Sequence, residues 1–137
     1  MLSFKGVFAS VLLLFSLAGG TSQNKEVPPQ EPPYRHQQFL DFLVQCESTG
    51  NPNAVNPKDL DGTPSYGLLQ FKKGTLYNYL LKYKILPDIE RQEVMNVIFD
   101  GDLQIRIFKK MMEDPSVNLS AEFPACLSKF LTSGRIP

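Results

Sequence analysis

Apolar residues recur at helical spacing through most of the chain after its first quarter. Phe39, Leu43 and Cys46 fall on one face of a helix that we expect over 35–48, with polar residues between them. The same spacing predicts four further helices, over 73–84, 88–99, 101–113 and 123–131. No stretch alternates like a long strand. The pattern therefore predicts an all-α, mainly helical single domain over residues 35–137.

Local signals mark the ends of these helices. Gly50 is a suitable stop for the first helix, and Pro87 and Pro115 interrupt later ones. Asp100 is the expected N-cap of the helix over 101–113. Glu47 falls in the last turn of the first helix, where the helix dipole disfavours an acid. A local disagreement of this kind is typical of a functional side chain, and equally of an ordinary surface Glu.

A polar stretch over 49–65 follows the first helix. More than half of its residues are Asn, Asp, Gly or Pro, which favour turns. An ordered connection of this length in a compact domain is usually functional. Asp59 and Asp61, with Asn56 nearby, faintly resemble a calcium loop, but the pattern ending in Glu is absent. We expect neither a metal site nor a cofactor.

The first residues have the composition of an export signal. Lys5 is the only charge before an apolar run over 7–17, and small residues follow it. The run is shorter than the roughly 20 residues that span a bilayer, so a signal peptide over 1–22 is a better interpretation than a transmembrane anchor. Residues 23–34 contain four prolines and form the expected linker. We expect an exported protein with no stable membrane anchor after cleavage.

Charge and cysteine content limit the ligands and the compartment. The chain carries 14 basic and 14 acidic residues, and no Lys or Arg run exceeds two, which argues against a nucleic-acid partner. A neutral or carbohydrate ligand fits this balance better. Cys46 and Cys126 can form a disulfide after export, and two buried free thiols are the alternative. Tyr77, Tyr79 and Tyr83 fall at helical spacing and serve either the core or a sugar site.

Three short motifs in one stretch of 24 residues resemble the lytic transglycosylase family, relatives of goose-type lysozyme. They are Glu47-Ser48 at a helix end, Asn-Pro-Asn-Ala-Val over 51–55, and Gly-Leu-Leu-Gln over 67–70. Their order matches the catalytic segment of that family. The resemblance implies a small lysozyme-like fold with a long loop after its first helix. It also implies that peptidoglycan glycan strands are the substrate, and an envelope-spanning assembly is a compatible further partner.

The resemblance also implies the role of each residue. Glu47 would be the sole acid and base, cleaving the bond between N-acetylmuramic acid (MurNAc) and N-acetylglucosamine (GlcNAc) and forming a 1,6-anhydro ring. Burial beside leucines and the helix end would raise its pKa. The expected substrate-binding residues are Ser48, Tyr66, Gly67, Leu68 and Gln70.

Two features depart from the family pattern. Glu47 and Gly67 are about five residues further apart than is common. The family's later Ala-Tyr-Asn-Ala-Gly type motif, which places a Tyr opposite the acid, is absent, and residues 123–130 occupy roughly its place. Two alternatives therefore stay open: a hydrolytic muramidase with Asp59 or Asp61 as second carboxylate, and a non-catalytic glycan-binding envelope protein.

Overall fold

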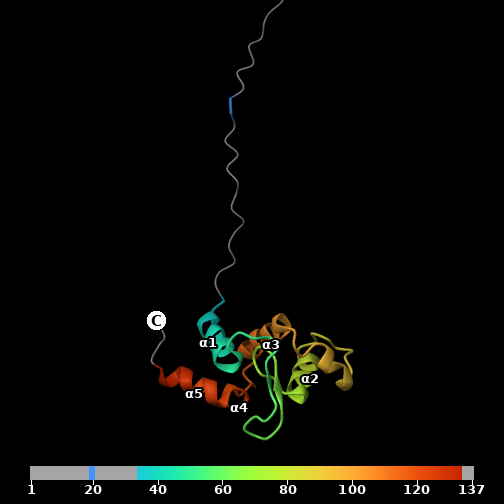
Figure 1. Cartoon of the computed structure of the whole chain (residues 1–137). Coiled ribbons are helices and arrows are strands. Elements are labelled where there is room, and N and C mark those ends of the chain that lie inside the picture. Colours follow the sequence, from blue (N-terminus) through green and yellow to red (C-terminus); the bar gives the residue numbers. More distant parts are fainter. Residues whose placement is uncertain (1–18, 21–33, 134–137) are drawn as a thin grey trace, which may run out of the picture. The chain divides into compact units, whose positions relative to one another are not determined.

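The computed structural model describes residues 19–20 and 34–133 (Figure 1). Contacts divide the chain into two units, Met1–Pro32 and Pro33–Pro137, and the following description concerns the second. The expected signal peptide over 1–22 and the linker over 23–34 lie almost entirely outside the described residues. Within the described part of the chain, no helix is both long enough and apolar enough to cross a bilayer.

The second unit is mainly helical, as the periodicity predicted. In Figure 1, α3 lies between α1 and α2, while α4 and α5 follow each other along one side. The described elements are α1 (Gln37–Ser48), β1 (Val55–Asn56), β2 (Ser65–Tyr66), α2 (Lys73–Lys82), a 3-10 helix η1 (Arg91–Asn96), α3 (Gly101–Glu113), α4 (Leu119–Glu122) and α5 (Pro124–Thr132). The two strands pair antiparallel, with Val55 opposite Tyr66, and turn the long polar stretch into a hairpin.

Helix α3 supplies the centre of the core. Its buried side chains Leu103, Ile107, Phe108 and Met111 recur at helical spacing, which gives the helix one continuous apolar face. The ring centroid of Phe108 lies 5.7 Å from that of Phe39 on α1 and 6.0 Å from that of Phe123. These aromatic contacts join the first, central and last parts of the domain around one core. Asp100 begins α3 as expected, since its side chain accepts from the Leu103 N–H at 3.0 Å.

The expected helix over 88–99 is wrong in type and length. Only residues 91–96 are helical, as a 3-10 helix capped reciprocally by Glu90 and Glu93. Val97 leaves the helical region with φ −120°, and the Ile98 carbonyl accepts from the side-chain amide of Gln104 at 2.6 Å. The Ile98 carbonyl is thus bonded to a side chain of α3 and not to a backbone N–H of its own segment.

Candidate active site

Glu47 lies in the last turn of α1, where the sequence placed it. The helix ends because Thr49 adopts a left-handed conformation (φ 53°) and Gly50 follows it with φ 80°. The Thr49 and Gly50 N–H groups then donate to the Gln45 and Val44 carbonyls. This closed turn fixes the backbone that carries Glu47.

A disulfide bond also anchors the last turn of α1, which carries Glu47. Cys46, next to Glu47, is bonded to Cys126 on α5, with a Cα–Cα distance of 5.9 Å and a sequence separation of 80 residues. The predicted disulfide is thus confirmed, and the free-thiol alternative is wrong. Because Cys126 follows Ala125 directly, the bond joins the backbone at Glu47 to the segment that faces it.

Glu47 is half-buried in a pocket of about 190 Å³. One wall comes from the hairpin loop, and the other from the junction of α4 and α5. The lining residues are Glu47, Asp59, Leu60, Asp61, Lys72, Ala121, Glu122, Pro124 and Ala125. Leu68 and Leu69, from which the sequence predicted the burial of Glu47, do not line this pocket; the apolar lining instead comes from the two walls.

The environment of Glu47 favours its protonated form. Burial, followed by the negative charge of Asp59, raises the pKa of Glu47 to about 7, while Lys129 acts in the opposite direction. A carboxyl group with a pKa near neutrality can donate a proton and later accept one at ordinary pH. The pocket therefore has the main electrostatic requirement of a general acid.

Two of the three sequence motifs, those over 51–55 and 67–70, are joined by hydrogen bonds of the Gln70 side chain. The Gln70 side-chain amide donates to the Gly67 carbonyl at 2.8 Å and to the Ala54 carbonyl at 3.2 Å. Its oxygen accepts from the Ser65 hydroxyl at 2.9 Å. Gln70 thus connects the Asn-Pro-Asn-Ala-Val turn to the Gly-Leu-Leu-Gln segment and holds both strands of the hairpin.

A family comparison agrees with this arrangement. A family model described as the transglycosylase SLT domain matches residues 30–120, more than half of the chain. The chain belongs to this family. Neither the comparison with curated proteins nor that with solved structures gives a match. Family membership identifies a lytic transglycosylase-like catalytic domain, with peptidoglycan glycan strands as the substrate class and the cell envelope as the place of action.

Gly67 faces the protein interior of this SLT domain. It has φ 82°, and a Cβ built there would lie 2.2 Å from Nε2 of Gln104 and 2.8 Å from the Ile98 carbonyl. Gln104 is fully buried; its oxygen accepts from the Leu69 N–H at 2.7 Å and its amide donates to the Tyr66 carbonyl at 3.0 Å. The glycine therefore makes room for the amide that ties this loop to α3.

The other expected substrate residues have varied surroundings. Ser48 is buried and its hydroxyl donates to the Val44 carbonyl at 3.1 Å. Leu68 packs against Gly101 at the start of α3. Tyr66 packs edge-on against Phe99, with centroids 6.0 Å apart, and lines a pocket that borders the start of α2 and shares Lys72 with the Glu47 pocket. None of these three residues lines the Glu47 pocket.

Lys72 forms ion pairs with both acids of the hairpin loop. Its Nζ lies 2.7 Å from Asp61 and 3.4 Å from Asp59, and it also donates to the Thr63 hydroxyl at 2.8 Å. The hydrogen bond from Lys72, with further ones from Thr63, holds the pKa of Asp61 well below its usual range. Among the described residues, no group of three or more His, Cys, Asp and Glu side chains is arranged to hold a metal ion.

The groove continues beyond Glu47 through residues that the sequence analysis missed. A pocket of about 310 Å³ shares Asp59, Lys72 and Glu122 with the first and adds Gln70 and Thr75. A third, of about 270 Å³, is lined by Thr75, Asn78, Tyr79, Lys82 and Glu122. Thr75, Asn78 and Lys82 recur at helical spacing on α2 and form a polar stripe beside its apolar residues. This stripe is the feature of the sequence from which the outer groove could have been predicted.

The tyrosines of α2 pack beside the core rather than in the Glu47 pocket. Tyr79 and Tyr83 stack on each other with centroids 5.5 Å apart. The Tyr79 hydroxyl donates to Oε1 of Glu122 at 2.8 Å, and the Tyr83 hydroxyl donates to Asp114 at 3.0 Å. Tyr77 lies 5.9 Å from the Arg91 guanidinium.

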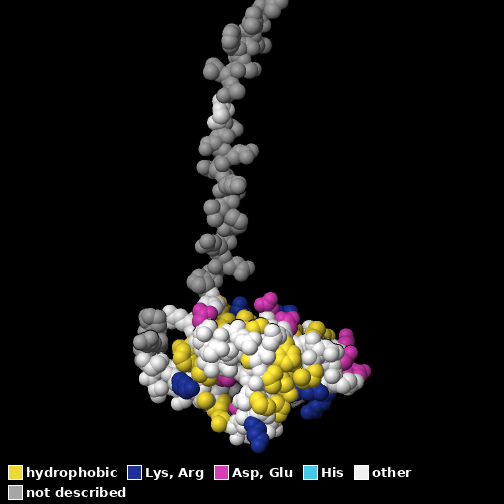
Figure 2. Space-filling view, in the orientation of Figure 1, with side chains coloured by type: hydrophobic (Ala, Val, Ile, Leu, Met, Phe, Trp, Pro, Cys, Tyr) yellow, Lys and Arg dark blue, Asp and Glu magenta, His cyan; other side chains and the backbone are white. Residues whose placement is uncertain are grey.

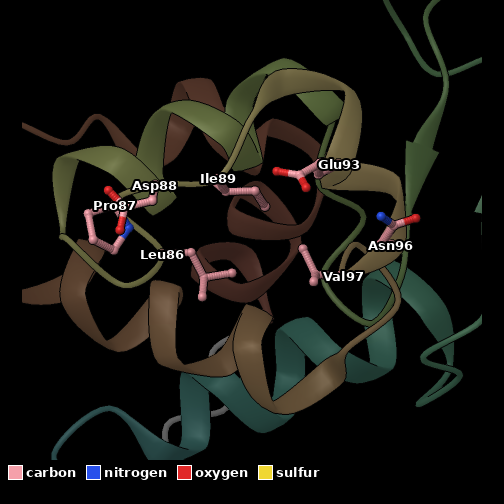
Figure 3. A pocket seen from close by; sticks show the side chains of 7 residues that line it. All are labelled: Leu86, Pro87, Asp88, Ile89, Glu93, Asn96 and Val97. Carbon is pink, nitrogen blue, oxygen red and sulfur yellow. The ribbon is translucent and has the colours of Figure 1, made fainter.

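A further depression of about 330 Å³ lies in the segment between α2 and α3 (Figure 3). Leu86, Ile89 and Val97 form its apolar part, and the carboxylates of Asp88 and Glu93 lie at its margin. It shares no lining residue with the Glu47 groove. It therefore takes no part in the geometry around the acid.

Proposed function

We propose that this domain is a lytic transglycosylase that cleaves the MurNAc–GlcNAc bond of peptidoglycan with Glu47 as its sole acid and base. The observation that best supports this proposal is the Glu47 carboxyl itself, which is half-buried in a pocket at the end of α1 and has its pKa raised to about 7. About half of such groups are protonated at neutral pH, as a general acid requires.

Each step follows from the proton on Glu47. Glu47 donates it to the glycosidic oxygen as the bond from C1 of MurNAc breaks, and an oxocarbenium-like centre develops at C1. The carboxylate then takes the proton from the C6 hydroxyl of the same sugar, and that oxygen bonds to C1. The products are a GlcNAc hydroxyl and a 1,6-anhydroMurNAc end, and Glu47 is protonated again.

The roles of the neighbouring residues belong to the same proposal. Tyr66 and Gln70 line pockets beside α2 and contact the glycan there. Ser48 and Gly67 are turned into the protein and support the helix end and the loop. Leu68, packed on Gly101, keeps that loop against α3 while its exposed part contacts substrate.

The charge of the surface argues against a densely charged polyanion as the ligand. Formal net charge is zero. On the face that Figure 2 shows, Lys and Arg side chains lie at separate places rather than in one patch. A dispersed arrangement of this kind offers no track for a polyanion.

Export is a further part of the proposal. The signal peptide over 1–22 and the linker over 23–34 would deliver the domain of residues 35–137 to the wall, where its disulfide persists in an oxidising compartment. N-terminal sequencing of protein recovered from the envelope is expected to begin at Thr21 or Gln23. A sequence that begins at Met1 would contradict export with cleavage.

One observation favours the muramidase alternative. Asp59 lines the Glu47 pocket, and its carboxylate lies 3.4 Å from Nζ of Lys72. A second carboxylate across a glycosidic bond can stabilise the transition state or activate water. On that mechanism the product is a reducing MurNAc end.

Product analysis tests these mechanisms. Purified peptidoglycan is digested with the wild type, with Glu47→Gln and with Glu113→Gln, a matched change at an exposed position, and the muropeptides are read by mass spectrometry. We expect anhydro ends from the wild type and Glu113→Gln, and none from Glu47→Gln. Reducing ends would establish the muramidase instead. Binding to sacculi without release of muropeptides by the wild type or by either variant would establish a glycan-binding module.

A further inference from the structure

Glu122 stands where three adjoining pockets meet. It lines the pocket of Glu47, the pocket that adds Gln70 and Thr75, and the polar pocket on α2. A side chain at such a junction contacts any ligand that extends from one pocket into the next. Its position makes Glu122 the link between the acid and the outer groove.

The Glu47 pocket needs such an extension. Its volume of about 190 Å³ is smaller than the roughly 300–1,000 Å³ of ordinary ligand sites. It therefore holds only a small part of a polymeric substrate. The pocket on α2 adds about 270 Å³, and the stripe from Thr75 to Lys82 continues the groove by about 10 Å along the helix axis.

The lining of the outer pocket suits a sugar. Thr75 and Asn78 offer a hydroxyl and an amide, which both donate and accept hydrogen bonds. Lys82 is already engaged, since it lies 2.6 Å from Asp114 and donates to the Ser116 hydroxyl at 2.8 Å. The pocket therefore presents uncharged polar groups beside the Glu122 carboxylate and a Lys82 ammonium that is paired with Asp114.

Tyr79 fixes the orientation of that carboxylate. Its hydroxyl donates to Oε1 of Glu122 at 2.8 Å. Burial and the bond to Glu122 raise the pKa of Tyr79 above its usual range, so the hydroxyl remains a donor at ordinary pH. The other oxygen of Glu122, Oε2, forms no hydrogen bond with any described residue and is available to a ligand.

From this geometry we propose that Glu122, oriented by Tyr79, is a specificity-determining residue that accepts a hydrogen bond from a sugar beyond the cleaved pair. The donor is a ring hydroxyl or an acetamido N–H, and the sugar lies along the α2 stripe of Thr75 and Asn78. This inference rests on the proposed glycan substrate and extends it to the outer groove. It makes the domain prefer strands longer than a disaccharide.

Binding to a non-cleaving protein tests the inference apart from catalysis. In the Glu47→Gln background, calorimetry measures the Kd of a GlcNAc–MurNAc tetrasaccharide and of the corresponding disaccharide. Glu122→Gln and Tyr79→Phe are added singly, and Tyr83→Phe is the matched control. Tyr83 stacks on Tyr79, and its hydroxyl is likewise bonded to a carboxylate, that of Asp114. Asp114 lines none of the three pockets, so Tyr83→Phe removes an equivalent hydrogen bond away from the proposed sugar site.

We expect Glu122→Gln and Tyr79→Phe to weaken tetrasaccharide binding about five- to tenfold, the effect of losing a fixed charged acceptor. Disaccharide binding and the Tyr83→Phe control remain unchanged. With Glu47 intact, the same two changes raise KM for long strands more than they lower kcat. Equal Kd values for all variants, equal losses for both ligands, or no tetrasaccharide binding by the parent would overturn the inference. Tetrasaccharide binding that depends on Glu122, with no cleavage by the wild type, would instead overturn the proposed function and leave this inference standing.

Discussion

Replacing Glu47 with Gln should make the domain more stable at alkaline pH and leave its stability unchanged at acid pH. The folded protein raises the pKa of Glu47 to about 7, chiefly through burial and then through Asp59. The unfolded chain ionises the same carboxyl near its ordinary pKa of 4.5. Below that value both states hold a neutral Glu47. As pH rises from there through about 7, the unfolding free energy of the wild type falls, because the ionised Glu47 is poorly hydrated in the folded state and well hydrated in the unfolded chain.

The size of the effect follows from the two pKa values. A carboxyl pKa raised from 4.5 to about 7 corresponds to about 3 kcal/mol of unfolding free energy between the pH extremes. Glu47 is half-buried, and solvent screens its interactions, so we expect about half of this, ~1.5 kcal/mol. Glutamine has nearly the same shape and carries no charge, so it avoids this loss.

Urea unfolding followed by circular dichroism measures the difference at about pH 4 and about pH 8. Glu47→Gln should exceed the wild type by ~1.5 kcal/mol at the higher pH and match it at the lower one. Glu113→Gln, at an exposed position, controls for the general effect of removing one negative charge. An equal difference between Glu47→Gln and wild type at both pH values would refute the reasoning about the raised pKa.

Three further changes test neighbouring features. Asp59→Asn removes a charge that raises the pKa of Glu47, so the alkaline limb of kcat/KM against pH should move to lower pH; an unmoved limb would show that the two groups do not interact. Replacing Cys46 and Cys126 together with Ser opens a loop of 80 residues and should lower the unfolding free energy by about 4 kcal/mol, with unchanged thermal stability as the contrary result. Gln104→Leu leaves three backbone groups, two of them in buried hydrogen bonds, without their side-chain partner. It should cost about 2–4 kcal/mol in urea unfolding, and a neutral change would mean that the loop does not depend on this amide.

Much of the fold followed from local patterns. The apolar periodicity and the cap at Asp100 predicted α3 with its observed bounds, and Gly50 correctly marked the end of α1 within two residues. The prediction of a helix over 88–99 was wrong because apolar residues there, such as Val94 and Ile98, are buried without forming a regular α-helix. Near its end, the Ile98 carbonyl accepts from the Gln104 side chain on α3, a contact that apolar periodicity does not predict.

The candidate site divides in the same way. The position of Glu47 at a helix end could be seen from the sequence, and so could the order of the three motifs within one stretch. The opposite wall could not, since Ala121, Glu122 and Pro124 approach Glu47 only through the packing of α5 on α1 and the disulfide. Polar residues at helical spacing on α2 were visible but gave no indication of which face borders the groove.

The sequence by itself determined a helical SLT domain with one acid at the end of its first helix, because helix periodicity, turn residues and a short motif are local properties. Tertiary structure alone decided the surroundings of that acid. Burial, the charge of Asp59 and the junction at Glu122 arise from segments far apart in the chain, and the pKa of Glu47 depends on all of them. Glu47 is therefore recognised from local sequence, while its chemistry is set by the packing of the hairpin loop and the α4–α5 junction around it.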